Sequence, residues 1–247
     1  MAFDLPSHGS QSGAGIPIPG SPLIIGHRGA AGIRPENTLS SFEKAVELNV
    51  GAVELDVHLC EGELVVIHDT TLQRTTNGTG NVSDQTLANL RQLDAGDGQW
   101  IPTLAEVFTA VPEIVGINVE LKGEGTAAHL AQFLTGLPEN RRDVLVSSFN
   151  HGLLREFATA RPGVKTAPLF SKWREDAVKT AESFGGFINL SSRIVNRKRC
   201  DELCRSGLAV SVYTVNELAL GRKLASWGVS GIFTDYPDRI TRDALAR

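Results

Sequence analysis

The sequence contains few cysteines and no long apolar run, and each shortage argues against a class of protein. Three cysteines occur among 247 residues, and this odd, widely spaced set does not form a disulfide framework. Cys200 and Cys204 lie one helical turn apart, and we expect them to pack as small apolar residues, because a zinc site would need two further ligands. No segment reaches the roughly 18 consecutive apolar residues that a membrane-spanning helix needs.

The first twenty residues contain no lysine or arginine and are rich in glycine, serine and proline. They lack the basic start and the apolar middle of a secretory signal. We interpret residues 1–20 as a flexible arm and residues 21–247 as one domain. We therefore expect a cytoplasmic protein without stable membrane association. Removal of a longer leader is an alternative that the sequence leaves open.

Positive charge is sparse. The chain carries 24 Lys and Arg against 28 Asp and Glu, a formal net charge of -4. No basic run provides the electrostatic surface of a nucleic-acid binder, so we expect no nucleic-acid partner. An anionic substrate would require positive charge placed locally at its binding site. The oligomeric state is left open by these features.

Short β-rich apolar runs alternate with helical patterns along the chain from Pro22. The predicted strands are 23–27, 52–58, 116–122, 144–148, 165–170, 186–190, 209–215 and 231–234. The predicted helices are 37–48, 103–110, 126–134, 151–160, 173–183, 196–205, 216–226 and 237–246. Eight βα units with short connections predict an α/β fold, a single TIM-type (β/α)8 barrel. A doubly wound open sheet is the alternative.

One stretch interrupts this alternation after the second strand, at about residues 59–101. It is too long for an ordinary βα loop. Residues 63–68 are typical of a short extra strand, and residues 86–93 of a small helix. We interpret the stretch as a small insertion over the barrel mouth, too short to hold a core of its own.

Acidic residues occupy the second and third predicted strands. Glu54 and Asp56 are two positions apart, so their side chains point to the same side of the strand. Two buried like charges need a neutralising partner, and carboxylate oxygens suit Mg²⁺ or Ca²⁺. Glu120 on the next strand completes a set of three metal ligands that does not favour zinc. The alternative is a pair of structural acids held in ion pairs.

Two histidines are expected near the same mouth. His27 and Arg28 end the first strand, and His68 follows the extra strand. A cation, Arg28 and Lys122 can stabilise charge on phosphoryl oxygens, while one histidine deprotonates a nucleophile and the other protonates the leaving alkoxide. His58 is either a supporting residue or a satisfied core residue.

Eleven short motifs stand in a fixed order along the chain. They are HRG (27–29), PENT (35–38), GAVELD (51–56), HD (68–69), RTTNG (74–78), LDAG (93–96), IPTL (101–104), NVELK (118–122), SSF (147–149), TVN (214–216) and GIFTDYP (231–237). This set resembles the glycerophosphodiester phosphodiesterase family, of the bacterial cytoplasmic type, over nearly all of residues 23–240.

The resemblance implies roles for named residues. It implies His27 and His68 as the acid–base pair. It implies one divalent cation on Glu54, Asp56 and Glu120, and phosphate contacts from Arg28 and Lys122. Phe149 and Tyr213 would line the substrate pocket. The family usually has tryptophan where this chain has Tyr213, so the added hydroxyl puts the polarity of the pocket in question.

The implied activity is metal-dependent hydrolysis of a small-molecule glycerophosphodiester to sn-glycerol 3-phosphate and an alcohol. Alternatives are a lysophospholipase D-like or phospholipase C-like enzyme on the same barrel, or a catalytically silent barrel that binds phosphodiesters. The preferred alcohol, the choice between Mg²⁺ and Ca²⁺, and the choice between direct water attack and a cyclic phosphate intermediate stay open.

Overall fold

Eight parallel strands close into a barrel, as predicted. The computed structural model describes residues 2–3, 21–138 and 143–246. The barrel strands are β1 (Leu23–Gly26), β2 (Ala52–Cys60), β4 (Gly116–Leu121), β5 (Val144–Ser148), β6 (Lys165–Phe170), β7 (Phe187–Ser191), β8 (Ala209–Tyr213) and β9 (Gly231–Thr234). Strand β1 pairs with both β9 and β2, which closes the sheet. The extra strand β3 (Glu63–Val66) pairs with β2 in antiparallel fashion, outside the barrel.

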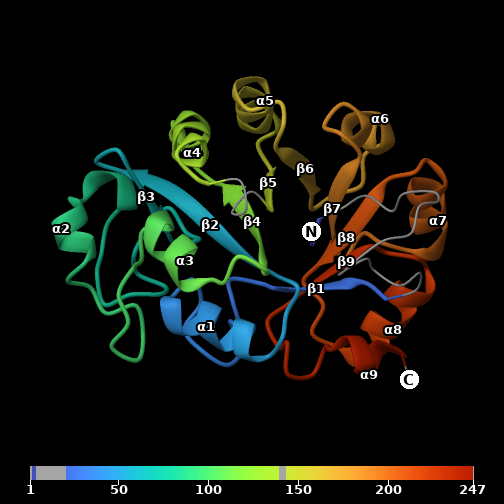
Figure 1. The fold of residues 1–247 in the computed structure, drawn as a ribbon, viewed down its shortest axis with the longest axis horizontal. Coiled ribbons are helices and arrows are strands. Elements are labelled where there is room, and N and C mark those ends of the chain that lie inside the picture. The colour runs from blue at the N-terminus through green and yellow to red at the C-terminus, as the bar shows by residue number, and fades with distance from the viewer. Residues whose placement is uncertain (1, 4–20, 139–142, 247) are drawn as a thin grey trace.

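Helices surround the barrel (Figure 1). They are α1 (Leu39–Glu47), α3 (Leu104–Ala110), α4 (Thr126–Thr135), α5 (His151–Ala160), α6 (Ala177–Glu182), α7 (Arg197–Arg205), α8 (Leu218–Ser226) and α9 (Arg242–Ala246). Threonines cap two of them: Thr38 caps α1, and Thr103 forms a capping box with Glu106 at α3. Within the described ranges, no helix has the length and apolar character needed to cross a membrane.

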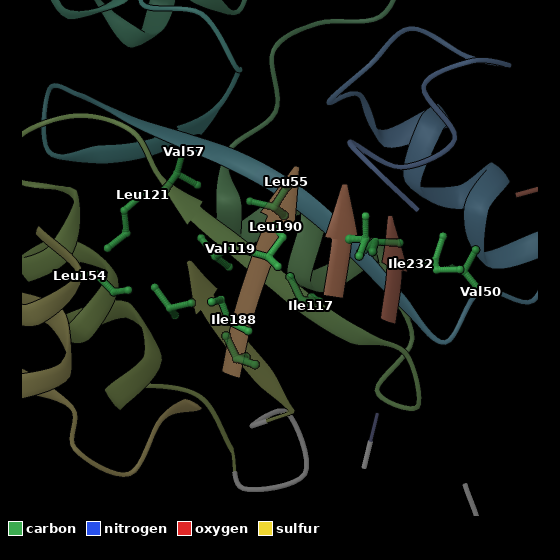
Figure 2. Packing of buried hydrophobic residues seen from close by; sticks show 14 of the residues in the cluster. Val50, Leu55, Val57, Ile117, Val119, Leu121, Leu154, Ile188, Leu190 and Ile232 are labelled. Atoms are coloured by element: carbon green, nitrogen blue, oxygen red, sulfur yellow. The ribbon is translucent and has the colours of Figure 1, made fainter. Parts of the chain in front are cut away.

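The larger part of the apolar core lies between the strands and the helices. Outward-facing residues of β2 and β4, such as Val57 and its cross-strand partner Leu121, belong to this layer together with Leu154 of α5 (Figure 2). Because alternate residues of a strand face opposite sides, the other half of each strand lines the barrel interior.

The interior is apolar at the base and polar at the mouth. At the base, Leu23, Ala52 and Leu145 form one cluster with Phe3, a residue that is 5% exposed. The rest of the arm predicted for residues 1–20 lies outside the described residues. Apolar packing at the base leaves the carboxyl ends of the strands as the place where polar side chains gather.

The insertion has a small apolar cluster of its own, which differs from the sequence-based expectation. It contains β3, the 3₁₀ turn Val82–Asp84 and the short helix α2 (Leu87–Leu90), and it lies at the left of Figure 1 beside β2. The cluster consists of Cys60, Val65, Ile67, Leu72, Val82, Leu90, Ala95 and Ile101. Cys60 belongs to β2, so this cluster packs around the end of a barrel strand.

Candidate active site

Three buried carboxylates converge at the mouth of the barrel. Glu54 and Asp56 come from β2 and Glu120 from β4, where Asp56 and Glu120 are cross-strand partners. One carboxylate oxygen from each residue lies within 4.8 Å of the others. Their exposed fractions are only 3%, 1% and 8%. The structure thus brings together the three acids that were predicted as metal ligands.

The acids differ in their ionisation. Burial, together with the charges of Asp56 and Glu120, raises the pKa of Glu54 well above its usual value. Burial and the charge of Asp56 raise the pKa of Glu120 to about 7. For Asp56, burial acts in the same direction, but Lys122 and Arg28 outweigh it and lower the pKa. The cluster therefore carries more negative potential than its neighbouring side chains neutralise.

The donor atoms fit a hard divalent cation. Oδ1 of Asp56 is buried and has no hydrogen-bond partner, and the same is true of Oδ1 of Asn118, a residue that lines the barrel mouth together with Glu54 and Glu120. A buried oxygen without a partner costs free energy unless a cation or water satisfies it. All candidate ligands are oxygens, which are the donors that Mg²⁺ and Ca²⁺ prefer.

His27 follows β1 and points between two acids. Its Nδ1 lies 2.7 Å from Oδ1 of Asp235, and its Nε2 lies 4.0 Å from Oε2 of Glu54. Burial raises the pKa of Asp235, but the hydrogen bond with His27 contributes to a net lowering. An ionised carboxylate only accepts hydrogen bonds, so Nδ1 of His27 holds the proton and Nε2 faces the acid cluster.

Asp235 belongs to the GIFTDYP motif, but the sequence did not indicate its role. It follows β9, and Asn216 holds it from two sides. The Asn216 side-chain amide donates to Oδ2 of Asp235 at 2.7 Å, and the Asp235 backbone N–H donates to Oδ1 of Asn216 at 3.0 Å. Its position directly after a barrel strand could have marked it as a site residue, because functional side chains lie at the carboxyl ends of barrel strands.

His68 reaches the same cavity from the segment after β3. Its Nδ1 lies 2.6 Å from Oδ1 of Asp69, and its backbone carbonyl lies 3.1 Å from Nε2 of His58. His58 therefore supports the segment that carries His68. Burial lowers the pKa of His68, although Asp56 and Asp69 act against this. At neutral pH this favours the neutral imidazole, which can take up a proton.

A chain of ion pairs connects His68 to Arg28. Arg74 Nε donates to Oδ2 of Asp69 at 2.6 Å, and its Nη1 donates to Oε2 of Glu36 at 2.8 Å. Glu36 also accepts from Nη1 of Arg28 at 2.6 Å. Sequence reasoning missed the roles of Asp69, Arg74 and Glu36, although all three stand in the quoted motifs. The connection fixes the insertion relative to β1.

Arg28 contacts the acid cluster with both its backbone and its side chain. Its backbone N–H donates to Oε2 of Glu54 at 2.9 Å, and its Nε lies 3.4 Å from Oδ2 of Asp56. The backbone of Arg28 is left-handed, with φ of 51°. This turn directs the amide of Arg28 toward the cluster.

Lys122 lies beside the acids. Its Nζ donates to Oε1 of Glu120 at 2.8 Å, lies 3.5 Å from Oδ1 of Asp56, and is 5.8 Å from the ring centre of Phe149. Lys122 does not line the cavity at the mouth, whereas Arg28 does.

A cavity of about 380 Å³ joins these residues. It is lined by His27, Arg28, Glu54, His68, Asn118, Glu120, Ser147, Phe149, Leu169, Ser171, Ser191, Ser192, Arg193, Tyr213, Thr214 and Phe233. Both predicted catalytic histidines and both predicted pocket walls, Phe149 and Tyr213, therefore face one space.

The hydroxyl of Tyr213, which could have made the pocket more polar, is engaged with the backbone. It donates to the backbone carbonyl of Phe170 at 2.8 Å. The rings of Phe149 and Tyr213 meet edge to face, with centres 5.8 Å apart. Because its hydroxyl already donates to this carbonyl, Tyr213 lines the cavity mainly with its aromatic ring.

Fold and site together define a (β/α)8 barrel whose mouth combines buried carboxylates, imidazoles and guanidinium groups, an arrangement suited to phosphoryl chemistry. The sequence model of the glycerophosphoryl diester phosphodiesterase family matches residues 27–239. The chain belongs to this family, as the motifs predicted.

Individual proteins agree with this assignment. A glycerophosphodiester phosphodiesterase of Caldanaerobacter subterraneus subsp. tengcongensis is 35% identical, with 88% of this chain and 96% of that protein covered. One of Bacillus altitudinis is 34% identical, with coverage of 89% and 96%. An Oleispira antarctica phosphodiesterase, solved in complex with the product sn-glycerol-3-phosphate, superimposes with a TM-score of 0.86 at 31% identity and covers 92% of this chain and 98% of its own.

Proposed function

We propose that the protein hydrolyses glycerophosphodiesters to sn-glycerol 3-phosphate and an alcohol, using one divalent cation and two histidines. The observation that carries the proposal is the placement of His27, His68 and the buried acid cluster around one cavity. The product bound to the Oleispira antarctica relative supports the same class of substrate. The serines that line the cavity favour a polar substrate over one with an acyl chain, which would need an apolar path.

Each group has a task in this reaction. Glu54, Asp56 and Glu120 would hold the cation, which supplies positive charge to phosphoryl oxygens. Arg28 adds a second positive charge at the same place. One imidazole takes the proton of the attacking hydroxyl or water, and the other donates a proton to the leaving alkoxide. Asp235 and Asp69 orient the two imidazoles through Nδ1.

The direct test measures release of sn-glycerol 3-phosphate from a panel of glycerophosphodiesters. The protein is first treated with EDTA and then supplied with Mg²⁺ or Ca²⁺. We expect turnover to disappear with chelation and to return with one of the two ions. Full turnover in the chelator would contradict the role of the cation, and absence of turnover on every substrate would contradict the proposed function.

Stability of the metal-free protein should fall as the pH rises. Glu120 has a pKa of about 7 in the folded chain and 4.5 as its ordinary value, so the folded chain retains a proton that the unfolded chain has released. Stability from this group is present at pH 4.5 and is lost as the pH passes 7, by on the order of 3 kcal/mol. A bound cation removes the repulsion, so its stabilising effect should be larger at pH 8 than at pH 5. Thermal unfolding with EDTA or with Mg²⁺ at the two pH values checks this, and an equal shift at both would contradict it.

Arg74 should act by positioning His68. In the variant Arg74→Gln, Asp69 and Glu36 lose their shared partner, so the imidazole of His68 is held less firmly. We expect kcat to fall about tenfold to a hundredfold with little change in KM, because loss of a residue that orients a functional group through a hydrogen bond typically has an effect of this size. The matched control is Arg91→Gln, which removes the ion pair between another arginine of the insertion and Glu106 of α3. An equal loss of kcat in both variants would show that Arg74 only stabilises the insertion.

A further inference from the structure

One cation of the cavity, Arg193, has no charged partner among the described residues. Arg28 is paired with Glu36 and Asp56, and the acids of the cavity belong to the cluster on β2 and β4. Arg193 also lines the cavity, yet its guanidinium forms no ion pair or side-chain hydrogen bond with any residue that the structure describes. An uncommitted guanidinium in a substrate cavity is a potential partner for an anion.

Arg193 lies across the mouth from the reacting groups. It follows β7, and the strand order of the barrel places β7 opposite β2, four positions around the ring (Figure 1). A phosphodiester whose phosphorus lies at the acid cluster would therefore extend its other end toward Arg193. Three serines, Ser171, Ser191 and Ser192, line the cavity near this end of the barrel, and among the described residues no acid lines it there.

The backbone that carries Arg193 is anchored on both sides. The backbone N–H of Ser192 donates to the carbonyl of Tyr213 at 2.6 Å, and that of Ile194 donates to the carbonyl of Ser191 at 3.0 Å. Arg199 of α7 also donates to the carbonyl of Ile194. An anchored turn presents the guanidinium from a fixed place, which lowers the entropic cost of binding.

The aromatic ring of Phe149 is an unfavourable place for a quaternary ammonium group. Such a group binds the faces of aromatic rings. Here Nζ of Lys122 already lies over the Phe149 ring, 5.8 Å from its centre, so a second cation at this ring would meet a like charge. At the other end of the mouth, a cationic headgroup would face the guanidinium of Arg193.

We propose that Arg193 selects glycerophosphodiesters whose alcohol carries a second anionic group, a carboxylate or a further phosphate. This inference rests on the proposed function and adds the substrate class. Because Arg193 binds the substrate away from the phosphorus, its contribution appears in KM rather than in kcat. The interaction is partly screened at the mouth, so its effect is about tenfold in kcat/KM.

The experiment compares kcat/KM for glycerophosphoserine and bis(glycerophospho)glycerol, which carry a carboxylate and a second phosphate, with that for glycerophosphocholine. We expect the wild-type chain to prefer at least one anionic substrate about tenfold, Arg193→Gln to remove this preference through KM, and Arg193→Glu to reverse it. The two anionic substrates show which group is recognised. Lys172→Gln is the matched control, because Lys172 is also an exposed cation near the mouth but does not line the cavity.

The outcomes distinguish selection by Arg193 from the proposed hydrolysis itself. Turnover of glycerophosphocholine by Arg193→Gln shows within the same assay that the variant is folded and active. If that variant keeps the wild-type preference, or if Lys172→Gln loses it equally, selection by Arg193 is overturned while the proposed function stands. If the wild-type chain turns over no member of the panel, the proposed function fails and this inference fails with it.

Discussion

Replacing His68 with alanine is expected to lower kcat by about 100- to 10,000-fold, the range typical for loss of a general acid or base. The imidazole lines the cavity, is half-buried, and has its Nδ1 occupied by Asp69, so Nε2 is the nitrogen available to substrate. The melting temperature should change little, because His68 is absent from the apolar cluster of the insertion. Steady-state kinetics on a glycerophosphodiester and thermal unfolding measure the two effects.

The control for this variant is His129→Ala. His129 is also half-buried, and its Nδ1 contacts the backbone carbonyl of Gly125 on α4, away from the cavity. The His129→Ala variant should retain wild-type turnover. His68→Ala with wild-type kcat would remove His68 from the acid–base pair, whereas a large fall in melting temperature would show that its main role is structural.

The variant Glu120→Gln is expected to change activity and stability in opposite directions. Removing one of the three proposed anionic ligands should lower turnover by at least about a hundredfold, since a catalytic cation contributes several kcal/mol. The same change removes a buried charge that is repelled by Asp56, while the amide oxygen still accepts from Lys122. Without metal at pH 8 the variant should therefore be more stable than the wild-type chain, by on the order of 1–3 kcal/mol.

Glu106→Gln is the matched comparison. Glu106 accepts from Arg91 and caps α3, so its replacement should reduce stability and leave turnover unchanged. Denaturant unfolding in EDTA and kinetics with added Mg²⁺ or Ca²⁺ distinguish the two acids. A Glu120→Gln protein that is less stable than wild type at pH 8 would show that Glu120 is held mainly as the partner of Lys122.

The barrel and its acids were predictable because they depend on local patterns. Continuous apolar runs mark buried parallel strands, and the two-residue period of a strand places the side chains of Glu54 and Asp56 on the same side. The boundaries were less predictable. Residues 173–183 were predicted as a helix, but α6 covers only Ala177–Glu182, and Trp173 lies before it with its ring under the guanidinium of Arg199. The last helix was predicted over 237–246 and begins only at Arg242.

The partners of the site residues were not predictable, because they come from segments far apart in sequence. Asp235 and His27 are 208 residues apart and meet only because β9 pairs with β1. Arg74 and Glu36 are 38 residues apart and meet only when the insertion packs over the mouth. Such contacts depend on barrel closure, which no local periodicity encodes. Arg193 likewise follows a strand without any motif that marks it.

The separate apolar cluster of the insertion affects how the enzyme responds to heat. His68 and its partners Asp69 and Arg74 belong to the segment that packs around this cluster, whereas His27 and the acids belong to the barrel. Segments with their own small cores open locally at a lower free energy than the whole fold. Thermal inactivation of this protein would therefore precede melting of its barrel and would reverse on cooling, so the insertion rather than the barrel sets the upper working temperature.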